Sequence, residues 1–165
     1  MVAEDNSEVA KLQERIKRMR YGHFQEKVEL VKALEKEFGS EVNDVVIEHV
    51  IDVHKKHWAK VAEKEGENGI PALLRTLWEP MKGNFEFTYE EKDEGIQMDV
   101  TFCPLAKMAQ ELDEADWGFR FYCMSDYGIV EGFNPKIGFK RTKTLMEGDR
   151  CCDHFYFMKE EDGKE

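Results

Sequence analysis

The hydrophobic periodicity of the chain first changes from helical to strand-like near residues 80–83, and this change constrains the fold more than any other feature. Before it, apolar residues recur every three or four positions, as in amphipathic helices. After it, apolar and polar residues alternate, as in strands with one buried face. The helical patterns cover residues 7–20, 24–38, 43–65 and 72–78.

Glycine and proline mark the expected ends of these helices. Tyr21-Gly22-His23 is expected to interrupt the first pattern, and Gly39 and Gly66 are expected to end the second and third. Pro71 suits the first turn of the short fourth helix. Because that helix is strongly apolar, we expect it to pack in the core or to form the face of a homodimer.

Two hairpins are expected in the second half, and helical patterns separate them. The strands are residues 84–90 and 96–102, then 136–145 and 150–158; the inserted helices are residues 104–112 and 117–130. The pattern of residues 117–130 is ambiguous between helix and other secondary structure, and we favour a helix. The fold class is α+β, with N-terminal helices packed on a four-stranded antiparallel sheet and one or two helices inserted between two hairpins.

The length suits a single domain over residues 1–165. Within it we expect a mainly helical layer (1–82), a sheet with inserted helices (83–158) and an acidic tail (159–165). The formal net charge of −11 disfavours nucleic acid and anionic membranes as partners. No apolar run approaches the roughly 20 residues of a membrane span, and the N-terminus lacks the pattern of a signal peptide. We therefore expect a cytoplasmic protein with reduced thiols.

All four cysteines fall in the last third of the chain. Cys103 lies between an expected strand and a helix opened by Pro104. Unpaired N–H groups at a helix start favour a thiolate, an oxyanion or a carboxylate, so this position is expected to lower the pKa of Cys103. The alternative is a small buried residue at a strand end.

Two further cysteines share faces with ionisable residues. Cys123 and Asp126 are three residues apart on an expected helix, although the spacing alone favours a buried cysteine beside a surface acid. Strand alternation puts Cys152 and His154 on one face and Cys151 and Asp153 on the other.

Two kinds of site follow from these residues. Cys103, Cys123 and Cys152 are candidate zinc ligands, with zinc as the candidate cofactor, although the sequence has no local metal-binding motif. Alternatively, one thiolate is a nucleophile and His154 or an acid transfers protons. Arg141 is a candidate for binding a substrate carboxylate.

Several phrases, in their order, resemble the L-2-amino-thiazoline-4-carboxylic acid hydrolase family. They are Cys103-Pro104, Tyr122-Cys123-Met124-Ser125-Asp126, Gly132-Phe133-Asn134-Pro135, Arg141-Thr142-Lys143-Thr144-Leu145, Gly148-Asp149 and Cys152-Asp153. The resemblance covers about the last 65 residues. It also extends distantly to small-molecule-binding domains of the vinyl-reductase type.

The resemblance implies a hydrolase that opens the ring of a 2-amino-thiazoline carboxylate to an N-carbamoyl-cysteine, with a small molecule as its partner. It favours Cys103, Cys123 and Cys152, together with Asp126 and Asp153. With the chemistry of the reaction, this makes Cys103, Cys123, Cys152 and Asp126 the candidate catalytic residues. Arg141, Asp153 and His154 are the candidates for substrate binding. The family pattern more often has an aromatic residue at the position of His154. The alternatives are a non-catalytic small-molecule-binding domain and a thiol or zinc sensor.

Overall fold

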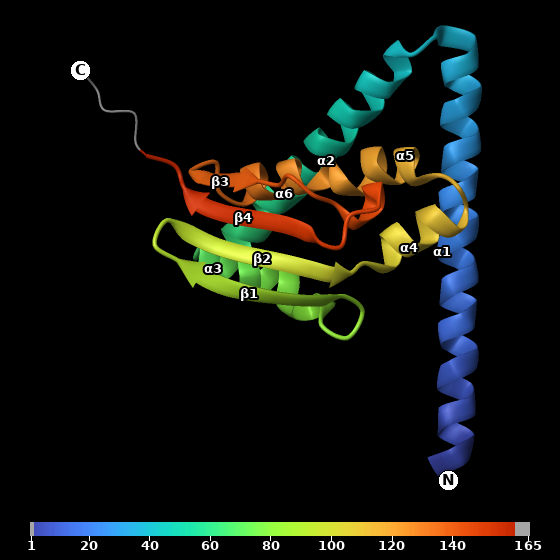
Figure 1. The fold of residues 1–165 in the computed structure, drawn as a ribbon, viewed down its shortest axis with the longest axis horizontal. Helices are drawn as coiled ribbons and strands as arrows, with labels where there is room; N and C mark the ends of the chain where they lie inside the picture. The colour runs from blue at the N-terminus through green and yellow to red at the C-terminus, as the bar shows by residue number, and fades with distance from the viewer. Residues whose placement is uncertain (1, 161–165) are drawn as a thin grey trace. The chain divides into compact units, whose positions relative to one another are not determined.

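The computed structural model describes residues 2–160 of the chain, which form two compact units (Figure 1). The first unit ends at Asn43 and the second begins at Asp44. No helix in the described part of the chain combines the length and apolarity that a membrane crossing requires.

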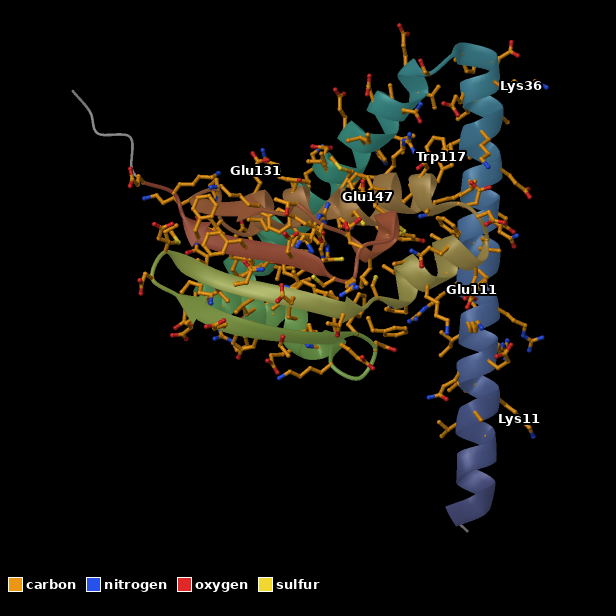
Figure 2. The ribbon with its side chains drawn as sticks, in the orientation of Figure 1. Lys11, Lys36, Glu111, Trp117, Glu131 and Glu147 are labelled. Carbon is orange, nitrogen blue, oxygen red and sulfur yellow. The ribbon has the colours of Figure 1, made fainter. Side chains whose placement is uncertain are left out.

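The first unit contains one long helix, α1 (Val2–Phe38). The expected interruption at Tyr21-Gly22-His23 is wrong, because the helix continues through all three residues. A single glycine in a helix costs only about 1 kcal/mol relative to alanine, which a helix of 37 residues tolerates. Gly39 ends α1 as predicted, with a φ of 89° that favours glycine. Charged side chains such as Lys11 and Lys36 project from α1 (Figure 2).

Helix α2 (Glu41–Glu65) leads into the second unit, and Gly66, at a φ of 74°, follows its last residue. Helix α3 (Ile70–Leu73) has Pro71 in its first turn, as predicted, and continues through a π turn (Leu74–Trp78) and a 3₁₀ turn (Glu79–Met81). The apolar residues of this segment are buried within the chain's own core: Leu73, Leu74, Leu77 and Trp78.

The predicted four-stranded antiparallel sheet is confirmed, with strand order β1-β2-β4-β3 (Figure 1). Its strands are β1 (Glu86–Lys92), β2 (Gly95–Phe102), β3 (Ile137–Lys140) and β4 (Cys152–Met158). The third strand ends five residues earlier than predicted. Beyond it, the Asp153 side chain accepts the backbone N–H groups of Thr142 and Lys143, so these groups do not continue the strand ladder. A short 3₁₀ turn follows at Leu145–Glu147.

The segment between the hairpins is helical, as predicted. It contains α4 (Pro104–Glu111), α5 (Ala115–Gly118), a π turn (Phe119–Cys123) and α6 (Ser125–Phe133). Together with α2 and α3, α6 contributes to the apolar core on one face of the sheet. The core includes Trp58, Leu73, Trp78, Met98, Ile129, Phe133 and Tyr156. Because successive side chains of a strand point to opposite faces of the sheet, every second residue of β4 faces the helices.

Two glycines let α6 lie directly against the backbone of α2. A Cβ atom at Gly128 would lie 2.2 Å from the carbonyl oxygen of Ile51, and one at Gly132 would lie 2.3 Å from that of Lys55. Both distances are far below van der Waals contact, so only glycine fits without moving the helices apart. This close approach fixes the start of α6, where Asp126 lies.

We expect Gly128→Ala to destabilise the protein by about 3 kcal/mol, because its methyl group collides with backbone that cannot rotate away. Urea unfolding followed by circular dichroism measures this loss. Gly69→Ala is the matched control in the same unit: its Cβ would meet only the Pro71 ring, at 3.7 Å, and its stability is expected to stay within about 0.5 kcal/mol. Equal stabilities for the two variants would contradict the close packing of α6 on α2.

Candidate active site

A cavity of about 390 Å³ opens between the helices and the sheet of the second unit. Part of its wall is apolar, with contributions from Trp58, Leu77, Trp78, Phe85, Val100 and Met146. Six of the candidate site residues also line it, from four separate stretches of the sequence: Cys103, Cys123, Asp126, Arg141, Cys152 and His154. A chamber of this size and lining suits a small organic molecule.

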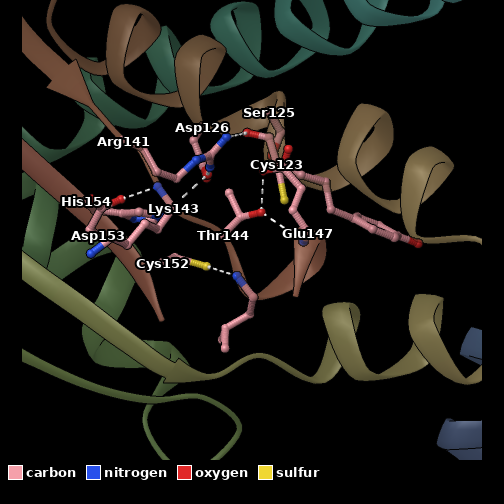
Figure 3. A network of polar contacts seen from close by, with 12 residues as sticks. Cys123, Ser125, Asp126, Arg141, Lys143, Thr144, Glu147, Cys152, Asp153 and His154 are labelled. Carbon is pink, nitrogen blue, oxygen red and sulfur yellow. Dashed lines mark hydrogen bonds and ion pairs between the residues drawn. The ribbon is translucent and has the colours of Figure 1, made fainter. Parts of the chain in front are cut away.

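A partly buried ion pair lies in the wall of this cavity. Arg141 Nη1 donates to Asp126 Oδ2 at 2.5 Å, and Arg141 Nη2 donates to the carbonyl oxygen of Cys123 at 3.2 Å (Figure 3). Only 3% of the Arg141 side chain is exposed. Its guanidinium carbon lies 5.6 to 5.8 Å from the centres of three aromatic rings, those of Phe119, Tyr127 and Phe139. Arg141 is therefore held by Asp126 and by these three aromatic rings.

Burial raises the pKa of Asp126 to about 6, even though the charge and the hydrogen bond of Arg141 favour the carboxylate. Desolvation thus outweighs the ion pair. An acid with a pKa near 6 changes protonation close to neutral pH, as a general acid or base must. The sequence predicted that Cys123 and Asp126 share a helical face, and both do line the cavity.

His154 is buried on β4 and points toward the same carboxylate. Its Nε2 lies 3.9 Å from Asp126 Oδ2, and its Nδ1 lies 3.3 Å from the hydroxyl of Tyr156. Burial, helped by the nearby charge of Arg141, lowers the pKa of His154 to about 3. The imidazole is consequently neutral at physiological pH.

Cys103 is the N-cap residue of α4, as predicted from the sequence. Its sulfur accepts the backbone N–H of Ala106 at 3.4 Å. The expected lowering of its pKa does not occur, because burial raises the pKa by more than the N–H groups at the helix start lower it.

The other two cavity thiols are also held in the protonated form. Burial raises the pKa of Cys152 to about 11, although its sulfur accepts the backbone N–H of Leu145 at 3.2 Å. Burial, followed by the charge of Asp126, raises the pKa of Cys123 as well. All four cysteines are free thiols, and Cys151 does not line the cavity. Strand alternation thus correctly distinguished Cys152 from Cys151.

The predicted zinc site does not form in this structure. Within residues 2–160, no group of three or more His, Cys, Asp or Glu side chains is arranged to hold a metal ion. Cys103, Cys123 and Cys152 line a common cavity. Two of the three sulfurs instead accept backbone N–H groups.

Asp153 lies on the opposite face of β4, outside the cavity wall. Its carboxylate accepts the N–H of Thr142 at 2.8 Å, the hydroxyl of Thr142 at 2.5 Å and the N–H of Lys143 at 2.6 Å. Burial opposes ionisation, but these hydrogen bonds outweigh it and lower the pKa of Asp153. Asp153 therefore holds the segment that follows Arg141, and Lys143 is exposed.

Some cavity residues were not proposed from the sequence. Ser125 and Tyr122 line the wall, and Tyr156 lies behind His154. The period-2 pattern that put Cys152, His154 and Tyr156 on one face could have indicated Tyr156. His54 and His57 also line the cavity; His54 Nδ1 lies 2.9 Å from the carbonyl oxygen of Val50 in its own helix.

Comparison with known families identifies the family of the chain. The model of the L-2-amino-thiazoline-4-carboxylic acid hydrolase family matches residues 17–156. The chain belongs to this family. The match begins within α1 and includes β1, β2, β3 and β4 as far as Tyr156, so it extends well beyond the last 65 residues that carry the resembling motifs. A search of curated proteins found no match. All the cavity residues of this thiazoline-carboxylate hydrolase family member lie within the matched range.

Proposed function

We propose that this protein opens the ring of 2-amino-thiazoline-4-carboxylate, or of a closely similar cyclic amidine, and releases an N-carbamoyl-cysteine. Membership of the family supports the substrate class. The observation that carries the proposal is the Asp126 carboxyl group, which lines a small-molecule cavity and has a pKa raised to about 6.

The reaction consumes one water molecule. Its oxygen bonds to the ring carbon that lies between nitrogen and sulfur, and the bond from that carbon to the ring sulfur then breaks. One proton of the water ends on the former ring nitrogen and the other on the released sulfur. The product therefore carries a urea carbonyl and a free thiol.

Asp126 is the proposed base and acid of this sequence. As a carboxylate it takes a proton from the attacking water, and as the acid it returns that proton to the departing sulfur. Arg141 positions Asp126 through the 2.5 Å ion pair. A substrate carboxylate bound directly to Arg141 would compete with Asp126, so we assign Arg141 to positioning.

The thiols are proposed to form the wall that contacts the sulfur-containing ring. Burial raises the pKa values of Cys103, Cys123 and Cys152, so little thiolate is present at neutral pH. This favours attack by water over attack by a thiolate. If the route is covalent, Cys103 is the expected nucleophile, because it alone of the three caps a helix start.

Incubation of the purified protein with L-2-amino-thiazoline-4-carboxylate, followed by mass spectrometry, tests the proposal. We expect N-carbamoyl-cysteine to form, and Cys103→Ser, Cys123→Ser and Cys152→Ser each to retain at least about a tenth of kcat/KM, since none is the nucleophile. Loss of turnover in Cys103→Ser, with a mass adduct on Cys103 of the wild type, would replace water attack by the thiolate route. Saturable binding without product would instead favour the non-catalytic small-molecule-binding domain, and absence of both would refute the proposal.

A further inference from the structure

A chain of buried hydrogen-bonding groups leads from Trp78 to the cavity. Trp78 Nε1 lies 3.1 Å from the hydroxyl oxygen of Tyr156, which in turn lies 3.3 Å from His154 Nδ1. Tyr156 is 1% exposed and His154 is 4% exposed, so water does not replace these contacts. The order of the three groups determines which of them donates and which accepts each hydrogen bond.

An indole nitrogen can only donate, so the Tyr156 oxygen accepts the hydrogen bond from Trp78. The single proton of the tyrosine hydroxyl is then free to be donated to His154 Nδ1. A neutral imidazole that accepts at Nδ1 carries its own proton at Nε2. The opposite tautomer would leave the Tyr156 proton buried without an acceptor, which is unfavourable.

His154 Nε2 is fully buried and has no hydrogen-bond partner among the described residues. The imidazole is held between the rings of Trp78 and Phe139, whose centres lie 5.4 Å and 5.2 Å away. It also belongs to the cavity wall. The structure therefore holds an immobilised neutral N–H donor within the wall of the chamber that contains Asp126.

The 3.9 Å between His154 Nε2 and Asp126 Oδ2 is too long for a direct hydrogen bond. One oxygen atom at about 2.8 Å from both would bridge them. Because Nε2 has almost no water-accessible surface in this structure, the side chains around it must shift slightly to admit that atom. We propose that His154, held as the Nε2–H tautomer by Tyr156 and Trp78, positions the attacking water on Asp126. The water accepts from His154 and donates to Asp126, and a lone pair remains for the ring carbon. This inference rests on the proposed hydrolytic function.

Two measurements on the substrate-free wild-type protein test the arrangement independently of turnover. Long-range ¹H–¹⁵N correlation spectra are expected to show His154 as the neutral Nε2–H tautomer, and Tyr156→Phe is expected to shift the tautomer equilibrium toward Nδ1–H. A high-resolution crystal structure is expected to show an ordered water within hydrogen-bonding distance of both His154 Nε2 and Asp126 Oδ2. An Nδ1–H tautomer in the wild type, or no water at this position, would overturn the inference even if the thiazoline is hydrolysed.

Kinetics then separate a role in positioning water from a role in packing. His154→Phe keeps an aromatic ring but no donor, and is expected to lower kcat by about 10²-fold with KM within about twofold. His154→Gln places an amide N–H near the former Nε2 and is expected to recover at least about tenfold of that loss. An increase in KM with unchanged kcat, or equal kcat values for the two variants, would refute the role in positioning water. If the wild type does not hydrolyse the thiazoline, the proposed function fails. The spectra and the crystal structure still test the tautomer of His154 and the position of the water.

Discussion

Asp126→Asn is expected to lower kcat/KM for the thiazoline by about 10³-fold, because an amide can neither take a proton from water nor return one to sulfur. In the wild type, kcat/KM is expected to rise with pH and to level off above about pH 6, where Asp126 becomes ionised. Steady-state kinetics between pH 4.5 and 8 measure both effects. Protonation of the substrate would give the same decrease of kcat/KM at low pH. The pKa of the free compound, determined by titration, shows whether the decrease comes from the substrate or from Asp126.

Asp99→Asn is the matched control for this substitution. Asp99 lies on β2 opposite Asp153, on the sheet face that does not line the cavity, and its carboxylate accepts from Gln97. Its replacement removes the same charge and is expected to leave kcat/KM within about twofold. An Asp126→Asn variant that keeps more than about a tenth of wild-type activity would exclude Asp126 as the general base.

Local patterns were sufficient to predict much of the fold. The change from period 3.6 to period 2 correctly separated helices from strands, because each period reports which side chains face a core. The strand alternation of β4 put Cys152 and His154 on one face and Asp153 on the other. Cys152 and His154 line the cavity, whereas Asp153, a candidate for substrate binding, does not. The continuous α1 was missed because propensity treats Gly22 as a break, whereas a long helix absorbs its cost.

The remainder of the site depends on contacts between residues distant in sequence. No local pattern shows that Arg141 pairs with Asp126, or that Asp153 ends β3 by accepting the N–H groups of Thr142 and Lys143. The direction of the pKa shift of Cys103 also could not be predicted from local sequence. Sequence reasoning identified the helix start that favours a thiolate, but burial by the surrounding elements determines the net direction.

Arg141→Met is expected to destabilise the protein by about 3 to 5 kcal/mol at pH 7, because it leaves the Asp126 carboxylate buried without its counter-charge. The folded-state pKa of Asp126 is already raised to about 6 from an ordinary 3.8, and loss of Arg141 raises it further. A raised pKa means that the folded protein binds the proton more tightly than the unfolded chain, so acidification stabilises the folded state relative to pH 7. The deficit of Arg141→Met relative to the wild type should therefore shrink between pH 7 and pH 5, as measured by urea unfolding.

The double variant Asp126→Asn/Arg141→Met isolates the unpaired charge as the cause. Without a carboxylate to leave uncompensated, it is expected to recover more than half of the stability lost at pH 7 and to show little further gain at pH 5. His154 also loses a neighbouring positive charge in both variants, so its contribution cancels in the comparison. If Arg141→Met is as stable as the wild type but has a greatly increased KM, Arg141 binds the substrate carboxylate instead. Equal deficits at both pH values, with no recovery in the double variant, would show that the aromatic contacts of Arg141 matter more to folding than its charge.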